Sequence, residues 1–304
     1  MTALYRAFDV VVTAVHRLSP SFVRIVFGGD DLAGFAEEGL DQRVKLLLPN
    51  ARGGYPEADL SSAGWYAAWC ALSAEERPPM RTYTVRRRWT TDDRVFLDVD
   101  FVLHGAGGPA SRWAGSVAVG DRVKIIGPDA PAGGPWGSVA WNPPEGARRY
   151  LLAGDETAAP AIAAVLESLP PGTTTRAFIE VPAADDILPI ATAEGTRVTW
   201  LPRAGHTLHG ALLAAAIRAA IPAAALADAA DSTETGEGTI WEVPGLDPAT
   251  GARLPTTAST GTYVWLAGES GLIRELRRHL VGTAGIDRGS VAFMGYWRLG
   301  AAES

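Results

Sequence analysis

The pattern of apolar residues changes near position 147, and this change limits the chain to a fold with two different halves. Before it, short runs rich in Val, Ile and Phe are bounded by Gly, Pro, Asp or Ser, which is typical of β-strands. The runs cover residues 8–15, 21–27, 43–48, 82–87, 95–103 and 122–126. Together with one short helix near Pro109, these strands predict a closed antiparallel β-barrel.

Strands and helices alternate in the second half. Strands are predicted at 149–153, 176–181, 196–201, 262–267 and 291–297, and helices at 157–169, 208–229 and 272–281. This alternation predicts a parallel α/β sheet with helices on its faces. A Pro- and Gly-rich segment at 127–146 separates the two patterns, so we predict a barrel domain over 1–146 and an α/β domain over 147–304. Residues 228–261, rich in Thr, Ala, Gly and Asp, are predicted to be a surface insertion without chemistry of its own.

Composition excludes several classes of protein. The 304 residues are 47% hydrophobic and 20% charged, which suits a soluble protein of two domains, and the net charge of −7 argues against nucleic acid as a main partner. Cys70 is the single cysteine, which excludes an internal disulfide and fits a reducing compartment. No apolar run is long enough to cross a membrane, and the N-terminus lacks the basic and then apolar pattern of a signal peptide. We therefore expect a cytoplasmic protein.

The stretch RTYTVRRR at 81–88 is an unusual strand. Its alternation places Arg81 and Tyr83 on one face and Thr82 and Thr84 on the other. A tyrosine ring can stack on a flat aromatic ligand while a guanidinium binds its phosphate and a threonine hydroxyl bonds a ring heteroatom. The alternative is an edge strand whose charges block aggregation.

A second candidate segment follows the predicted strand at 94–103. The sequence HGAGGPASRWA at 104–114 combines glycines, which allow a close approach of the backbone, with Pro109 at a helix start. The free amides at a helix start bind phosphate. We therefore predict a phosphate site here, whereas His104 without the neighbouring glycines is better explained as a capping or core residue.

These motifs and three later ones occur in a recognisable order. RTYT at 81–84 and HGAGGPASRWA at 104–114 are followed by GDETA at 154–158 with PAI at 160–162, WLAGES at 265–270 and GYWRLG at 295–300. The ordered set resembles the siderophore-interacting protein family of FAD-dependent ferric-siderophore reductases, which are related to ferredoxin-NADP reductases. The resemblance spans nearly the whole chain.

The resemblance implies an FAD site. Tyr83 would pack on the isoalloxazine ring, Thr84 would bond near it, and Arg81 would bind the pyrophosphate. The loop and helix start at 104–111 would bind the adenine-side phosphates through backbone amides, with Phe101 and Val102 lining the flavin. The predicted cofactor-binding residues are Arg81, Tyr83, Thr84, Phe101, Val102, His104, Gly107, Ala110, Ser111, Thr157 and Trp297.

The electron donor is less clear from the sequence. The turn after the strand at 149–153 is GDETAAP where a dinucleotide site often has GxGxxG, and two carboxylates there would repel a pyrophosphate. Thr157 is expected to cap the helix or to touch the flavin edge. Glu180, at the end of the next strand, would favour the ribose diol of NADH, although Arg203 could bind the additional phosphate of NADPH. The resemblance leaves ferredoxin open as a donor.

Iron is expected to arrive with the substrate. Among the five histidines only His206 and His209 are closely spaced, and they have no nearby third ligand, so no resident metal is expected. Ferric siderophores are often bulky and anionic. Lys45 and Arg298 are therefore predicted to bind the substrate, and Trp297 or Tyr296 to close over the flavin, by resemblance to the family and the wider superfamily.

Two other functions remain open at this point. A general flavin-dependent NAD(P)H reductase would turn over simple quinones or dyes without a preference for iron chelates. A non-catalytic siderophore-binding protein would bind the chelate without flavin reduction, and the GDETAAP turn keeps this alternative open.

Overall fold

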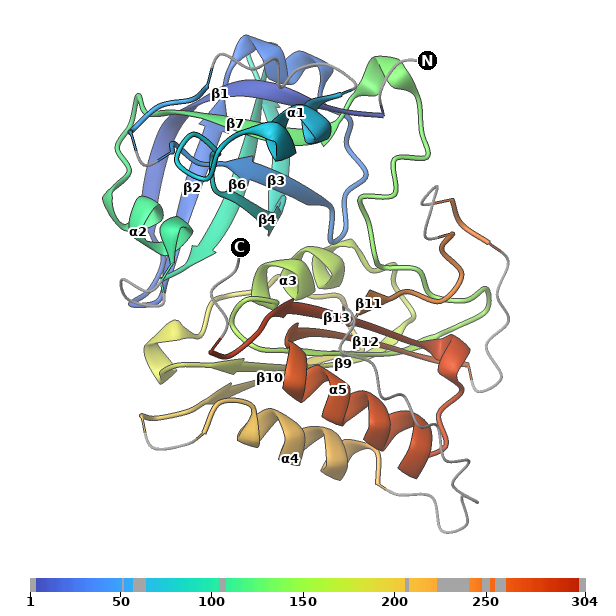
Figure 1. The fold of residues 1–304 in the computed structure, drawn as a ribbon. Helices are drawn as coiled ribbons and strands as arrows, with labels where there is room; N and C mark the ends of the chain where they lie inside the picture. The colour runs from blue at the N-terminus through green and yellow to red at the C-terminus, as the bar shows by residue number, and fades with distance from the viewer. Residues whose placement is uncertain are drawn as a thin grey trace. The chain divides into compact units, whose positions relative to one another are not determined.

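The computed structural model describes residues 4–50, 52–56, 64–103, 108–205, 208–222, 241–247, 252–254 and 261–300. The chain forms two compact units. The first is built from residues 1–139 and the second from residues 140–248 and 253–303. Each unit has its own β-sheet (Figure 1).

The first unit is a curled antiparallel sheet. Its strands are β1 (Tyr5–Arg17), β2 (Phe22–Gly28), β3 (Arg43–Leu47), β4 (Met80–Thr84), β5 (Arg87–Thr91), β6 (Arg94–Val102) and β7 (Arg122–Pro128). They pair in the order β4-β3-β7-β1-β2-β6-β5. Within the described residues β4 and β5 form the two edges, so the sheet is a half-barrel where the sequence predicted a closed barrel.

Apolar side chains fill the inside of the curl. Phe8, Ile25, Phe27, Leu97 and Phe101 are fully buried there because successive strand residues alternate between the two faces of the sheet. The helix α2 (Pro109–Ser116) contributes Ala110 and Ala114 to the same core.

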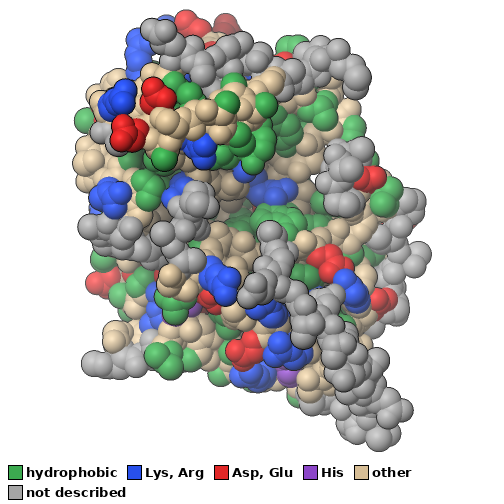
Figure 2. Space-filling model, viewed as in Figure 1, with side chains coloured by type: hydrophobic (Ala, Val, Ile, Leu, Met, Phe, Trp, Pro, Cys, Tyr) green, Lys and Arg blue, Asp and Glu red, His purple; other side chains and the backbone are tan. Residues whose placement is uncertain are grey.

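A second helix, α1 (Trp65–Ala71), packs on a smaller apolar cluster of the first unit. Trp65 and Trp69 pack there against Leu47 and Ile126. Figure 2 shows hydrophobic side chains reaching the surface of this unit around α1, where Tyr66 is 55% exposed. Two short 3-10 turns, Asp30–Gly34 and Ala130–Ala132, complete the unit.

The second unit is built on a mixed, largely parallel sheet. Its strands are β8 (Arg149–Gly154), β9 (Thr174–Val181), β10 (Thr196–Pro202), β11 (Trp241–Glu242), β12 (Thr262–Glu269) and β13 (Val291–Trp297), in the order β10-β9-β8-β12-β13-β11. All neighbours are parallel except β11, which is antiparallel to β13. Within the segment 228–261, which the sequence predicts to be a surface insertion, Trp241 and Glu242 add a short strand to the edge of the sheet. Most of the remaining insertion lies outside the described residues.

Helices cover both faces of this sheet. Helix α3 (Ala159–Ser168) lies on one face, and α4 (Ala211–Ala220) and α5 (Ser270–Arg278) lie on the other (Figure 1). A π-helical turn, His279–Thr283, extends α5, and 3-10 turns occur at Ala184–Asp186 and Arg288–Ser290. None of the described helices is long and apolar enough to span a lipid bilayer.

The strand order of the second unit reverses between β8 and β12. The chain runs from β8 to β9 and β10 on one side, and β12 and β13 follow on the other. In open α/β sheets, ligands bind outside the carboxyl ends of the strands at such a reversal. The residues that follow β8, β12 and β13 are therefore candidates for a functional site.

Candidate functional site

The pairing of β3 with β4 fixes the two faces of the RTYT segment. Tyr83 lies opposite Val44, and Arg81 lies opposite Leu46, so both point to the inside of the curl with these buried residues. Thr82 lies opposite Lys45 on the other face, and Thr84 is buried opposite Arg43. The register thus gives the alternation that the sequence predicted.

Tyr83 is held by a column of aromatic rings inside the curl. Its ring lies 4.2 Å from that of Phe101, which lies 5.7 Å from Trp113, and Trp113 stacks on Phe27 at 6.4 Å. Phe101 is fully buried, whereas Tyr83 keeps part of its surface exposed. The sequence predicts that Phe101 lines the flavin; in the structure this buried ring packs directly against Tyr83.

The start of α2 lies at the end of β6. Gly108 precedes the helix, Pro109 is its first residue, and Ala110 is buried. The Ser111 hydroxyl donates a hydrogen bond to the carbonyl of Val102 at 3.1 Å, which ties the helix start to the last residue of β6. A Cβ atom added at Gly108 would meet nothing within 4 Å, so the backbone is open there. His104 and Gly107 lie outside the described residues.

These residues of the first unit fit a flavin dinucleotide by their chemistry. Tyr83 offers a partly exposed ring that is already fixed, and Arg81, whose Nη1 donates to the Met80 carbonyl at 2.9 Å, lies two residues away on the same face. An aromatic face with a nearby guanidinium suits a ligand that carries both a flat ring and phosphate.

The two predicted substrate-binding cations lie in different units. Lys45 Nζ is 3.5 Å from Thr82 Oγ1, on the opposite face of the β3–β4 pair from Tyr83. Burial, with the nearby Arg43 charge, lowers the pKa of Lys45 from its ordinary value of 10.5. Arg298 is exposed just after β13 in the second unit.

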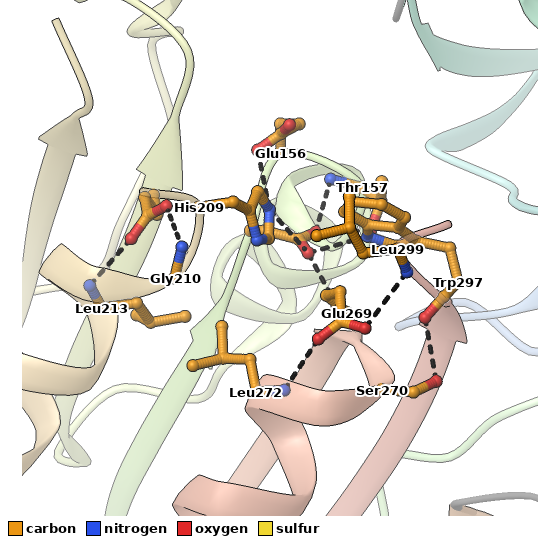
Figure 3. A network of polar contacts seen from close by, with 12 residues as sticks. Glu156, Thr157, His209, Gly210, Leu213, Glu269, Ser270, Leu272, Trp297 and Leu299 are labelled. Carbon is orange, nitrogen blue, oxygen red and sulfur yellow. Dashed lines mark hydrogen bonds and ion pairs between the residues drawn. The ribbon is translucent and has the colours of Figure 1, made fainter. Parts of the chain in front are cut away.

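In the second unit, the carboxylate of Asp155 joins three strand ends. Its partners Thr157, Glu269 and Trp297 lie close together in Figure 3. Asp155 directly follows β8 and is fully buried. Its Oδ2 accepts hydrogen bonds from the backbone N–H of Glu269 at 2.8 Å and from Trp297 Nε1 at 2.9 Å. Its Oδ1 accepts from the backbone N–H of Thr157 at 2.9 Å and from the Thr157 hydroxyl. The predicted residues Thr157 and Trp297 thus meet at one carboxylate that the sequence did not single out as a ligand.

His209 lies against the same carboxylate. Its Nε2 is 3.4 Å from Asp155 Oδ2 and 3.9 Å from Glu156 Oε2, and its ring meets Trp297 edge to face with the centroids 5.0 Å apart. Burial lowers the pKa of His209, but the Asp155 and Glu156 charges outweigh burial and raise it above 6.5. Burial raises the pKa of Asp155, yet His209, Thr157 and Trp297 together hold it below 3.8. Both members of the pair are therefore charged at intermediate pH.

Glu156 and Glu180 share one arginine. Arg203 binds both oxygens of Glu156 at 2.8 Å and reaches Glu180 Oε1 at 3.2 Å. Glu180 is fully buried and also accepts from the backbone N–H groups of Gly210 and Leu213 at the start of α4, at 2.6 and 2.9 Å. The sequence predicted that Glu180 would bind a ribose diol and favour NADH. That expectation is wrong for this structure, because the carboxylate binds α4 and Arg203.

The turn after β12 holds the chain that follows β13. Glu269 Oε2 accepts from the backbone N–H of Leu272 at 2.8 Å, and its Oε1 accepts from that of Leu299 at 3.2 Å. The Ser270 hydroxyl donates to the Trp297 carbonyl at 2.8 Å. Sequence reasoning found the GDETA and WLAGES motifs but not their contact. Acidic residues at the carboxyl ends of neighbouring parallel strands, Asp155 after β8 and Glu269 at the end of β12, are the sequence signal that could have found it.

Among the described residues, no group of three or more His, Cys, Asp or Glu side chains is placed to hold a metal ion.

Comparison with known families covers both units. Residues 11–132 match the model of a siderophore-interacting FAD-binding domain, and residues 147–300 match the model of the siderophore-interacting protein. A solved siderophore utilization protein from T. fusca is 29% identical, with a TM-score of 0.70 over 100% of this chain and 97% of that one. A ferredoxin reductase of carbazole 1,9a-dioxygenase, 15% identical with a TM-score of 0.57 over 96% of this chain and 70% of that one, has the same fold.

Curated relatives agree with these matches. An uncharacterized protein of Mycobacterium tuberculosis is 31% identical over 98% of this chain and 91% of its own length. The ferric vibriobactin reductase of Vibrio cholerae is 33% identical over 61% of this chain and 63% of its own. The NADPH-dependent ferric-chelate reductase of Escherichia coli is 31% identical over 64% and 70%. The chain therefore shares the fold of that ferredoxin reductase and matches an FAD-binding domain. The chain belongs to the siderophore-interacting protein family.

Proposed function

We propose that this protein is an FAD-dependent ferric-siderophore reductase, which reduces siderophore-bound Fe(III) by one electron and so releases Fe(II). The observation that carries the proposal is the fixed, partly exposed ring of Tyr83 beside Arg81, within a segment that matches the family's FAD-binding domain. The reductase names of two relatives support the reaction.

The proposed FAD site lies in a domain of residues 1–146. Tyr83 packs on the isoalloxazine ring, Thr84 bonds near it and Arg81 binds the pyrophosphate, while the segment from His104 and Gly107 to Ala110 and Ser111 binds the remaining phosphate. Val102 lies at the end of β6, tied to Ser111, so it borders this site. When bound, FAD supplies a carrier that accepts two electrons together and releases them singly.

The proposed electron donor is a nicotinamide nucleotide, bound by a domain of residues 147–304. The start of α3 is a poor pyrophosphate site. The amides of Thr157 and Ala158 are bonded to Asp155, at 2.9 and 3.0 Å, and that of Ala159 to the Glu156 carbonyl at 3.4 Å. The pyrophosphate is common to NADH and NADPH, so this helix start does not decide between them, and the name of the Escherichia coli relative favours NADPH. Reduced ferredoxin is a second possible donor.

The proposed substrate is an anionic ferric siderophore bound by cations. Lys45 and Arg298 are the candidates, and no side chain has to act as acid or base at the iron. Fe(III) accepts one electron, and the resulting Fe(II) binds hard oxygen ligands less well and leaves. What the chain supplies is orientation and positive charge. A cytoplasmic location fits the single cysteine and belongs to the same proposal.

Anaerobic reduction followed through the visible flavin bands tests this function. NADH, NADPH and reduced ferredoxin are added separately, and each is followed by a ferric siderophore with a colorimetric Fe(II) trap. We expect bleaching by at least one donor and recovery of the bands as Fe(II) appears. Rapid turnover of dyes without preference for iron chelates would instead indicate a general flavin reductase. Tight chelate binding without bleaching would indicate a binding protein.

A further inference from the structure

One carboxylate, that of Asp155, connects the strand ends at the point where the strand order of the second unit reverses. Gly154 ends β8, and Asp155 reaches across to the last residue of β12, where its Oδ2 accepts the Glu269 N–H at 2.8 Å. The same oxygen accepts the indole N–H of Trp297, the last residue of β13. Asp155 therefore connects three neighbouring strands at the edge where α/β sheets bind their ligands.

The backbone around Asp155 is built for this contact. Gly268 has a φ of +143°, and a Cβ atom at this position would lie 2.6 Å from Asp155 Oδ2. Glycine is therefore required for the carboxylate to reach the strand end. Because Asp155 is fully buried, an ionised group there is stable only with its hydrogen bonds and with His209 beside it.

Trp297 is held at three points. Its indole N–H donates to Asp155, and its backbone carbonyl accepts from the Ser270 hydroxyl. Its ring also contacts the His209 ring edge to face, with an angle of 81° between the two ring planes. The next residues are fixed as well, since the Leu299 N–H donates to Glu269 Oε1. Trp297 therefore has one defined orientation at the strand edge.

We propose that Asp155 is a positioning residue for the reduction, acting through Trp297. Its carboxylate fixes the indole at the carboxyl edge of the sheet and thereby shapes the surface on which the nicotinamide nucleotide is oriented. The functional part of this inference rests on the proposed function. Asp155 itself touches neither cofactor nor substrate in this account.

The indole N–H of Trp297 gives a direct readout that needs neither donor nor substrate. In the nitrogen-15 spectrum of the protein, Trp297→Phe identifies its signal. Asp155→Asn keeps the size of the side chain but removes the charge, so we expect the indole proton to move upfield and to exchange faster with water. Asp186→Asn is the matched control. Asp186 is also fully buried, in the 3-10 turn Ala184–Asp186 that follows β9, but it accepts from the backbone N–H of Ala183 at 3.2 Å.

Steady-state kinetics with the nicotinamide donor distinguish a loss of positioning by Asp155 from a general loss of stability. We expect Asp155→Asn to lower kcat/KM for the nicotinamide donor by about 10- to 100-fold, chiefly through KM, because small misplacements at an oriented site are costly. FAD content should not change. Asp186→Asn should leave KM at the value of the unmodified protein, since a purely structural loss reduces the amount of folded protein and not its KM.

The possible outcomes separately test the contact, the positioning role and the proposed function. An unchanged indole signal in Asp155→Asn would show that Trp297 does not bind Asp155. Rapid exchange of the indole N–H with water in the unmodified protein would show the same, and this measurement does not depend on whether Asp155→Asn folds. A shifted indole signal with unchanged KM and kcat overturns the positioning role. An unmodified protein that binds no FAD and oxidises no donor refutes the proposed function, and the indole measurements still decide whether Asp155 holds Trp297.

Discussion

The indole nitrogen of Trp297 lies 2.9 Å from Oδ2 of Asp155, although the two residues are 142 positions apart in the chain. The contact explains why the turn after β8 has an acidic sequence. Asp155 is used to hold the strand ends, and Glu156 is neutralised by Arg203. Both carboxylates are bound within the second unit and do not form an open acidic surface.

Gly268→Ala should destabilise the second unit. The φ of +143° at this position costs about 1–3 kcal/mol for a residue with a side chain, and the new methyl group would also collide with Asp155. Gly172→Ala is the matched control, because Gly172 has a φ of +83° and open space around it. Urea unfolding followed by amide hydrogen exchange in β8 and β12 measures the difference. Equal losses in the two variants would mean that Asp155 does not occupy this space.

The stability of the second unit should depend on pH through His209 and Asp155. The raised pKa of His209 gives a contribution that is complete below 6.5 and lost as pH rises through the raised pKa. The lowered pKa of Asp155 gives a contribution present above 3.8 and lost as pH falls through the lowered pKa. Glu156 and Arg203, which also face His209, raise and lower its pKa respectively. We expect a stability plateau between 3.8 and 6.5, measured by hydrogen exchange in β8.

His209→Gln should flatten the alkaline side of this profile. Gln cannot carry the charge that pairs with Asp155, so the loss of stability above 6.5 should disappear. His279→Gln serves as the control, since within the described part of the chain the His279 ring contacts the carbonyl of Ile221 and is paired with no carboxylate. A profile that is the same in both variants would show that His209 does not pair with Asp155 in solution.

Lys45→Gln should weaken ferric-siderophore reduction without loss of flavin. Removal of one cation from an anion site is expected to raise the KM for the chelate about 5- to 30-fold, equivalent to about 1–2 kcal/mol. In the unmodified protein the affinity should fall as pH rises through the pKa of Lys45, which burial lowers below 10.5. Lys124→Gln is the control, because Lys124 is paired with Asp9. Equal KM values in the two variants would exclude Lys45 from the substrate site.

Local sequence patterns predicted much of the fold. The strand at 291–297 coincides with β13, and the alternation of Arg81 and Tyr83 with Thr82 follows from the two-residue period of any strand. The open half-barrel was not predicted. The sheet closes into a barrel only if its edge strands β4 and β5 pair, and the strand propensities of single segments do not show which strands pair. The role of Trp241 was also missed, since a two-residue edge strand leaves almost no periodic signal.

The site was harder to predict than the fold. Tyr83, Arg81 and Thr157 could be predicted as site residues because each belongs to a local motif, and their roles remain predictions. The link between Asp155 and Trp297 depends on which strands are neighbours, so it appears only with the sheet order. Glu180 was misread for the same reason, because its partners Gly210 and Leu213 come from a helix 30 or more positions later.

If FAD binds against Tyr83 and Arg81, as we propose, the FAD content of purified variants must depend on these two side chains. Tyr83→Ala and Arg81→Ala are compared with Tyr66→Ala, which removes an exposed aromatic ring from α1 of the same unit. The visible flavin bands per protein are measured after reconstitution with FAD. We expect full bands in the unmodified protein and in Tyr66→Ala, and strongly reduced bands in the other two variants. Normal FAD content in both Tyr83→Ala and Arg81→Ala would contradict it.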